Sequence, residues 1–145
     1  MPKFYSNIST NRKFAVTSST VGNCDGDIVY FGAGEEMTIG TLYHYNSSGT
    51  WESAEADAVA TCDGLLAIAL GGESDVDGML LRGMVTIDHD PGAVGDVLFV
   101  SVTAGRISAI APSGSGDIVR VVGYCLHASN GNIWFDPDGT YLEVA

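Results

Sequence analysis

The sequence contains few basic residues, and they are unevenly placed. Only six of its 145 residues are Lys or Arg, against 18 Asp or Glu, so the formal net charge is −12. Three of the six bases lie in the first 13 positions, and no acid occurs before Asp25. The chain from Asp25 onward repels phosphate and has no basic stripe that could follow a nucleic-acid backbone. We therefore expect no nucleic-acid partner for this acidic body.

The chain also lacks a long apolar run and a sustained helical pattern. Its longest apolar stretch, residues 65–70, is far shorter than the roughly 20 residues that a membrane-spanning helix needs. Residues 1–14 are polar and interrupted by charge, so we expect no secretory leader and no membrane contact. No window keeps apolar residues at i, i+3, i+4 and i+7 over three turns. A fold built on helices is therefore not expected.

Cysteine is scarce and lacks the spacing of a metal or redox motif. The three cysteines are Cys24, Cys62 and Cys125, an odd number without any Cys-x-x-Cys pair. This pattern predicts buried free thiols in a protein made in a reducing compartment.

What the chain does contain is an internal repeat. Two segments have the same succession of short apolar runs and turns, residues 38–85 and residues 93–142. Gly40 and Gly95 are 55 positions apart, and Gly78 and Gly131 are 53 apart. A spacing that changes only at turns is what a duplicated β unit with variable loops would leave, and repeats of this kind fix the architecture.

Turn residues divide the rest of the chain into short β-rich runs about 8 to 12 residues apart, the spacing of sandwiches and barrels. Gly83 interrupts the longest run and predicts a bulge or a bend there. The expected strands are 27–32, 42–45, 65–70, 79–87, 97–102, 106–110, 118–126, 133–135 and 141–144. We predict an all-β fold, a compact barrel or sandwich with an internal pseudo-repeat. Residues 21–145 form a single β domain, and residues 1–20 an extended N-terminal arm.

The predicted arm is polar, with aromatic and basic residues spaced along it. One interpretation is a frayed terminus. The other is an arm that becomes ordered on a partner, because three aromatic residues have little use in a disordered tail. On the second interpretation the partner-binding residues are Lys3, Phe4, Tyr5, Arg12, Lys13 and Phe14.

Few residue clusters offer chemistry. Asp88, His89 and Asp90 could ligate a divalent ion, but adjacent strand residues point to opposite faces, which favours a solvated turn before Pro91. Asp-x-Asp pairs at residues 25–27, 75–77 and 136–138 fit turns better than calcium loops. Residues 114–116 form no nucleophile elbow. We expect no metal, no cofactor and no enzyme; a metal-assisted hydrolase using His89 is the weaker alternative.

Five aromatic residues could form a sugar-stacking platform, although packing in the core or an interface is favoured. These are Trp51, Trp134, Tyr43, Tyr45 and Tyr141. Trp134 and Tyr141 flank the turn at residues 136–139 and are expected to be cross-strand partners in a hairpin.

The second copy carries a family resemblance. Residues 102–124 read VTAGRISAIAPSGSGDIVRVVGY, and residues 133–144 read IWFDPDGTYLEV. Both segments, together with residues 64–70 and 81–85, resemble small virion proteins of tailed bacteriophages, notably marine and cyanobacterial ones. The resemblance covers about residues 27–145 and leaves out the arm.

The resemblance implies a capsid decoration, or cement, protein that is β-rich, non-enzymatic and often trimeric. Such a protein is made in the host bacterial cytoplasm and fastened to the outside of the head shell, where it bridges subunits of the major capsid protein. A phage tail or fibre component, or a receptor- or carbohydrate-binding module, is the alternative.

Overall fold

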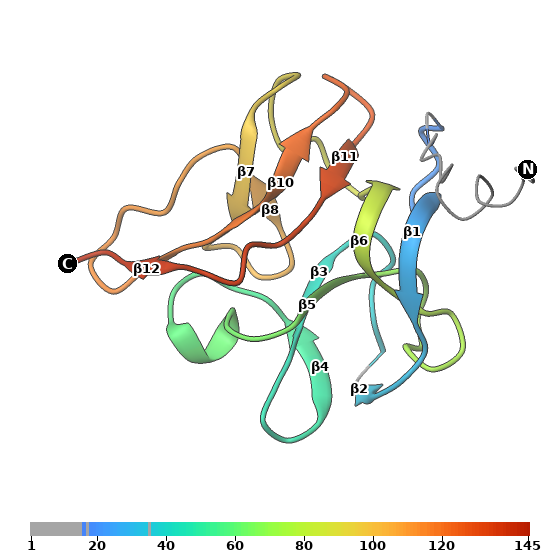
Figure 1. Cartoon of the computed structure of the whole chain (residues 1–145), viewed down its shortest axis with the longest axis horizontal. Helices are drawn as coiled ribbons and strands as arrows, with labels where there is room; N and C mark the ends of the chain where they lie inside the picture. The colour runs from blue at the N-terminus through green and yellow to red at the C-terminus, as the bar shows by residue number, and fades with distance from the viewer. Residues whose placement is uncertain (1–15, 17, 35) are drawn as a thin grey trace, which may run out of the picture.

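The structure is a computed structural model that describes residue 16, residues 18–34 and residues 36–145. The described chain is nearly all β and forms a strongly curled, half-barrel sheet, as the turn spacing predicts (Figure 1). A separate two-stranded sheet is formed by residues 118–119 and 142–143. The elements of the chain are β1 (Cys24–Val29), β2 (Ala33–Gly34), β3 (Leu42–Tyr45), β4 (Thr50–Ser53), a 3₁₀ turn (Val59–Thr61), β5 (Leu66–Ala69), β6 (Met79–Thr86), β7 (Val97–Val100), β8 (Ile107–Ser108), β9 (Ile118–Val119), β10 (Val121–Cys125), β11 (Asn132–Phe135) and β12 (Leu142–Glu143).

Strand β6 is the branch point of the sheet. It pairs with β1 along nearly its whole length. It also pairs with β5 at Met79 and Leu80, and with β11 from Gly83 to Thr86. Because a strand has only two edges, β5 and β11 must share the edge that β1 leaves free. The sheet therefore forks at β6 and sends one branch through β5, β3 and β4 and the other through β11, β10 and β7 (Figure 1).

The two branches meet again on the side away from β6. Leu42 in β3 donates its backbone N–H to the carbonyl of Gly105, and Gly105 donates to the carbonyl of Ala54. Ala56 accepts a backbone hydrogen bond from Ile118. These bonds satisfy backbone groups that the curled sheet would otherwise bury without partners. They close the fork into a barrel-like body.

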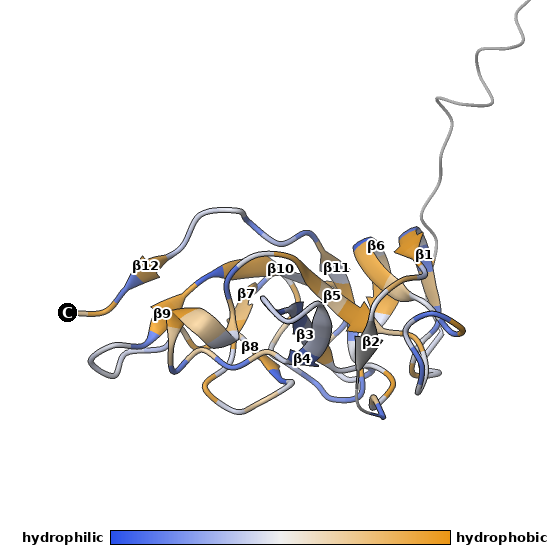
Figure 2. Cartoon of the chain, turned by 90° about the horizontal axis from the view of Figure 1, so that it is seen from below, coloured by the Kyte–Doolittle hydropathy of each residue, from blue (hydrophilic) through white to orange (hydrophobic). Residues whose placement is uncertain are grey.

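Most of the apolar core lies between the two branches. Buried side chains from both branches, among them Leu42, Ile68, Leu98 and Ile133, form one cluster. Strands β6 and β10 are largely coloured as hydrophobic in Figure 2, whereas the loops are mostly hydrophilic. A second, smaller cluster lies on the other face of the β3–β5 branch. That branch is therefore packed on both of its faces.

The two predicted copies have the same strand order, β4-β3-β5-β6 and β8-β7-β10-β11. Gly40 donates its N–H to Ala69, and Gly95 donates its N–H to Cys125 in the corresponding place. Both glycines have a φ of 80–85°, a left-handed conformation that side chains disfavour. The repeated spacing therefore coincides with a repeated turn. Descent from a duplication stays a prediction.

Several local expectations differ from the structure. The run at 118–126 is divided into β9 and β10, because Arg120 between them turns inward. The bulge in β6 falls at Leu81, which has no partner in the β1 register, whereas Gly83 is paired. No helix among the described residues is long and apolar enough to cross a membrane.

Candidate functional site

The six residues predicted to bind a partner through the arm lie outside the described residues. They are Lys3, Phe4, Tyr5, Arg12, Lys13 and Phe14. Their role stays a prediction. The body offers three other candidate sites. They are an open sheet face, an acidic cleft, and two separate histidines, His44 and His89, each of which is hydrogen-bonded to a carboxylate.

Four side chains that lie opposite one another on neighbouring strands form a row on the outer face of the sheet, from β6 through β11 and β10 to β7. Trp134 in β11 lies opposite Met84 in β6 and Tyr124 in β10, and Tyr124 lies opposite Val97 in β7. Directly opposed side chains in neighbouring strands touch one another. Tyr124 is 47% exposed and Val97 39%, while Trp134 and Met84 are half-buried. We call these four residues the outer strip.

The outer strip points away from the core, because its members alternate with core residues along each strand. Leu98, Cys125, Ile133 and Val85 are their immediate neighbours, and all four belong to the main core cluster. Successive strand residues point to opposite faces. The strip is therefore a largely apolar outer face, on which Tyr124 and Val97 are exposed and Trp134 and Met84 are half-buried.

One cation borders the outer strip. The guanidinium carbon of Arg82 lies 5.0 Å from the centre of the Trp134 ring, within the range of a cation–π contact. Its Nε is 3.4 Å from Asp136 Oδ1, and both side chains are about half exposed. Arg82 is one of only three bases in the acidic body. It gives the strip a polar edge with a fixed charge.

Three of the five aromatic residues suggested as a sugar platform lie together, since Tyr43 and Trp51 share a core cluster and the Tyr45 ring is 5.0 Å from that of Trp51. Trp134 lies in β11 and Tyr141 precedes β12. Tyr43 and Trp51 are buried in the second core cluster, and Trp51 donates its indole N–H to the carbonyl of Phe31 at 2.9 Å. This is the packing role that was favoured. The expected hairpin of Trp134 with Tyr141 is wrong, because β11 pairs with β6 and β10, while β12 pairs with β9. Residues 137–141 carry the chain away from β11 instead of turning it back.

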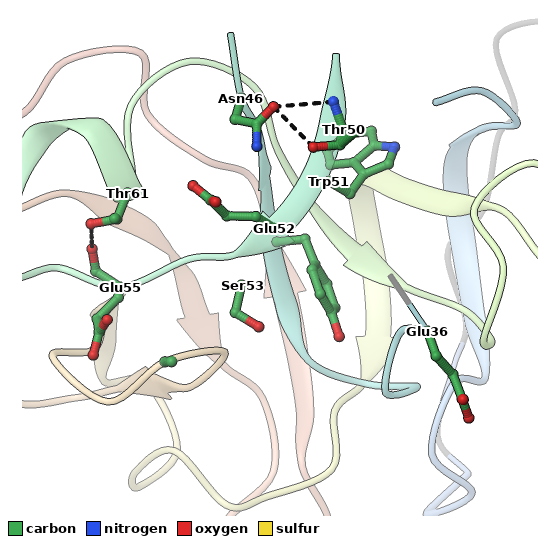
Figure 3. Close-up of a pocket in the computed structure, with 10 residues that line it drawn as sticks. Glu36, Asn46, Thr50, Trp51, Glu52, Ser53, Glu55 and Thr61 are labelled. Atoms are coloured by element: carbon green, nitrogen blue, oxygen red, sulfur yellow. Dashed lines mark hydrogen bonds between the residues drawn. The ribbon is translucent and has the colours of Figure 1, made fainter. Parts of the chain in front are cut away.

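An acidic cleft of about 680 Å³ lies beside β4 (Figure 3). Its lining includes Glu36, Glu52 and Glu55, with Trp51 among the apolar groups. The carbonyl of Glu55 accepts a hydrogen bond from the Thr61 hydroxyl at 2.6 Å, which fastens the 3₁₀ turn to the cleft wall. Three carboxylates attract cations and repel anions. The cleft could accept a basic group from a partner.

His44 lies at the edge of a second cleft, of about 550 Å³, which shares Glu52 with the first. The ring is only 1% exposed, and its Nε2 is 2.6 Å from Glu52 Oε1. Its Nδ1 is 3.8 Å from Asp63 Oδ1, too far for a hydrogen bond. Sequence reasoning missed this trio because Glu52 and Asp63 are eight and 19 residues from His44. The pairing of β3 with β4 places Glu52 opposite His44, and the pairing of β3 with β5 brings the turn that contains Asp63 to the same ring.

The Asp88–Asp90 segment is a turn with Asp88 and Asp90 exposed, as expected, but its histidine is turned inward. The His89 side chain is only 6% exposed, and its Nδ1 is 2.6 Å from Asp88 Oδ1. Its Nε2 accepts the backbone N–H of Ile107 at 3.0 Å. Asp90 accepts the N–H of Gly131 at 2.9 Å. Nε2 thus fastens the turn to β8, while Nδ1 is held by Asp88 within the turn, so both imidazole nitrogens are engaged.

Two of the three Asp-x-Asp pairs supply turn hydrogen bonds, whereas residues 25–27 are not the expected turn but part of strand β1. Asp77 accepts the N–H of Glu73, and Asp138 accepts the N–H and the hydroxyl of Thr140. The backbone hydrogen bond from Thr140 is the main reason that the pKa of Asp138 is lowered. Within the part of the chain that the structure describes, no three His, Cys, Asp or Glu side chains gather in metal-binding geometry.

The cysteines are free thiols, as predicted, and two of them are buried. Burial raises the pKa of the Cys62 thiol to about 11, so it stays protonated and unreactive at neutral pH. Arg120, 4% exposed, donates to the carbonyls of Cys62, Gly64 and Asp138 at 2.7–2.8 Å. Burial is also the main reason that the pKa of Arg120 is lowered. No sequence pattern marks Arg120 as an internal clamp between the two branches.

No family model, no curated protein and no solved structure matches the chain.

Proposed function

We propose that the chain is a non-enzymatic structural protein of a bacteriophage virion. In this proposal it is a capsid decoration protein that binds the outer head shell, through the major capsid protein, and stabilises it. One support is the resemblance of residues 102–124 and 133–144 to small virion proteins. These segments contribute β8 to β12, which belong mostly to the branch with the open outer face.

The observation that carries the proposal is the outer strip. Its side chains form an unbroken row across four strands, on a sheet face and not in a hollow. A row of this shape suits a protein surface better than a small substrate, which needs a concave site. Tyr and Trp are also the residue types that concentrate binding energy at protein interfaces.

The charge distribution supports the same role. A strongly acidic body avoids packaged DNA and stays soluble at high density on a particle. The basic arm supplies a second contact, to the capsid or to a neighbouring copy, and a trimer would triple both contacts. Weak contacts that are linked in this way add up through multivalency.

The test uses empty head shells of the phage that encodes the chain, mixed with purified protein and sedimented. We expect the intact protein to co-sediment and Tyr124→Lys to lose at least tenfold in affinity, because a buried charge at an interface core is costly. Tyr30→Lys is the matched control, since Tyr30 is 58% exposed but lies on the other branch. If the two variants bind equally, the strip is not the contact.

A deletion of residues 1–14 tests the arm separately. It removes all six arm residues but keeps Val16, which is buried, and Ser18, whose carbonyl accepts a hydrogen bond from Thr86. We expect weaker co-sedimentation by this variant at equal stability. An intact protein that ignores head shells and binds host cells or isolated tails would contradict decoration and favour the tail or fibre alternative.

A further inference from the structure

His44 holds a buried side-chain nitrogen without a hydrogen-bond partner, and it is the only such atom in the described chain. Its other ring nitrogen, Nε2, lies 2.6 Å from Glu52 Oε1. A carboxylate only accepts hydrogen bonds, so Nε2 carries the proton in the neutral ring and Nδ1 keeps its lone pair. A buried polar atom without a partner is unfavourable, and most such atoms in proteins bind something.

The oxygen nearest to this lone pair belongs to Asp63. Asp63 Oδ1 is 3.8 Å from His44 Nδ1, and the Asp63 side chain is 47% exposed. A zinc ion holds nitrogen and oxygen ligands at about 2.0–2.1 Å in tetrahedral geometry, which places two ligands about 3.3 Å apart. A small rotation of the half-exposed Asp63 side chain closes the difference. The gap is therefore of the size that an ion between the two atoms would produce.

Because Glu52 is hydrogen-bonded to the other ring nitrogen of His44, the arrangement of His44 and Asp63 resembles a metal site. Histidines that bind zinc commonly donate their other N–H to a carboxylate, which fixes the ring and makes it a stronger ligand. The adjoining cleft of about 550 Å³, lined also by Asn46 and Ser48, gives water access to the remaining coordination positions. We propose that His44 Nδ1 and Asp63 bind a divalent cation of the zinc class, with Glu52 orienting the imidazole.

The charge around the site sets its strength. Arg120 interacts electrostatically with Asp63, so its positive charge weakens the binding of a metal cation there. Only two side chains ligate directly, so the site is weaker than closed structural zinc sites with four protein ligands. Bound metal would join β3 to the turn that contains Asp63 and so stabilise the β3–β5 branch. This inference does not depend on the proposed virion role.

The first test is a titration of the intact protein with zinc chloride, followed by calorimetry. We expect one site per chain and at least tenfold weaker binding by Asp63→Asn, which keeps the side-chain shape. Glu52→Gln should lose about tenfold through the orienting hydrogen bond. Asp136→Asn is the matched control, because Asp136 is also 47% exposed and paired with a base. No zinc binding up to millimolar concentrations overturns the proposal, as does equal binding by Asp63→Asn.

The second test reads the His44 ring itself by ¹⁵N NMR and does not rely on a variant that must fold. Without metal we expect a proton on Nε2 only, and zinc should shift Nδ1. Protons on both nitrogens in the metal-free protein at neutral pH would leave no lone pair and overturn the site. A zinc shift at exposed His127 in place of His44 would do the same, since it assigns the ion to the surface.

Discussion

The branch of β5, β3 and β4 (the β3–β5 branch) and the branch of β11, β10 and β7 (the β7–β10 branch) have the same strand order. Their outer faces differ in what covers them. Strand β5 is buried at every position, while β10 exposes Tyr124. On the first branch Val29 and Met37 pack over Met79 and Trp51 and form the second core cluster. On the second branch the corresponding outer face carries the outer strip, in which Tyr124 and Val97 stay exposed.

The covering segment explains this difference. Residues 29–37 precede the first copy and have no counterpart before the second. Two hydrogen bonds fasten Phe31 and Gly32 in this segment: the Trp51 indole donates to the carbonyl of Phe31, and the Ser74 hydroxyl donates to the carbonyl of Gly32 at 2.9 Å. The outer face of the first branch is therefore core, while the outer face of the second keeps exposed residues. Surface of that kind is where we expect a partner.

The largest loss of stability is expected at Gly83 in β6, where β1, the strand that leads into the covering segment, pairs with β6. In Gly83→Ala the new methyl group would collide with the backbone of Asp25 and Gly26, so β1 could not stay paired with β6. We expect a loss of at least about 3 kcal/mol in the free energy of unfolding, measured by urea denaturation. Gly116→Ala is the control: Gly116 also has a positive φ (88°) but has nothing within 4 Å of its added methyl. Similar losses in both variants would mean that backbone strain, not the close approach of β1, dominates.

The next test compares one aromatic residue from each branch. Trp51→Ala removes a side chain that is 2% exposed and its hydrogen bond to Phe31, and should cost about 3–5 kcal/mol. Tyr124→Ala on the open face should cost no more than about 1 kcal/mol. Both values come from urea denaturation. A loss of 3 kcal/mol or more in Tyr124→Ala would show that the outer strip belongs to the core.

Alkaline pH probes a thiol in the covered branch. The pKa of Cys62 is raised from 9.0 to about 11 by burial, so the folded chain keeps a proton that the unfolded chain loses. Its contribution is therefore fully present below pH 9 and is lost as the pH rises towards 11. We expect a loss of about 2 kcal/mol at pH 11, and a smaller slope in Cys62→Ala. If the slope of stability against pH is unchanged in Cys62→Ala, another group causes the loss of stability at alkaline pH. Cys24 and Cys125, whose pKa values are also raised by burial, would then be tested next.

The smallest effect is expected at the polar edge of the outer strip. Arg82→Ala removes a cation over Trp134 and an exposed ion pair with Asp136, which together should contribute about 0.5–1 kcal/mol. A shift in Trp134 fluorescence should accompany the change. High salt should reduce the difference between variant and parent, because the ion pair is exposed. A loss above 2 kcal/mol would mean that Arg82 is structural.

Local patterns allowed much of the fold to be predicted. Turn glycines and β-rich runs located most strands, because those signals act within a few residues. The sequence could not reveal the fork at β6, since pairing with β1, β5 and β11 depends on contacts between distant segments. The outer strip was missed for the same reason. Trp134 and Tyr124 were visible as aromatic or apolar residues, but their register was not.

The fork also bears on how the chain could have arisen. Strand β6 ends against β11 in antiparallel register, and these are the last strands of the two copies. Two separate chains related by a twofold axis would meet through the same kind of antiparallel contact. A single copy would leave that strand edge open to any passing strand. The β6–β11 pair therefore joins the two halves through the kind of antiparallel contact that a twofold dimer would use, as the predicted duplication requires.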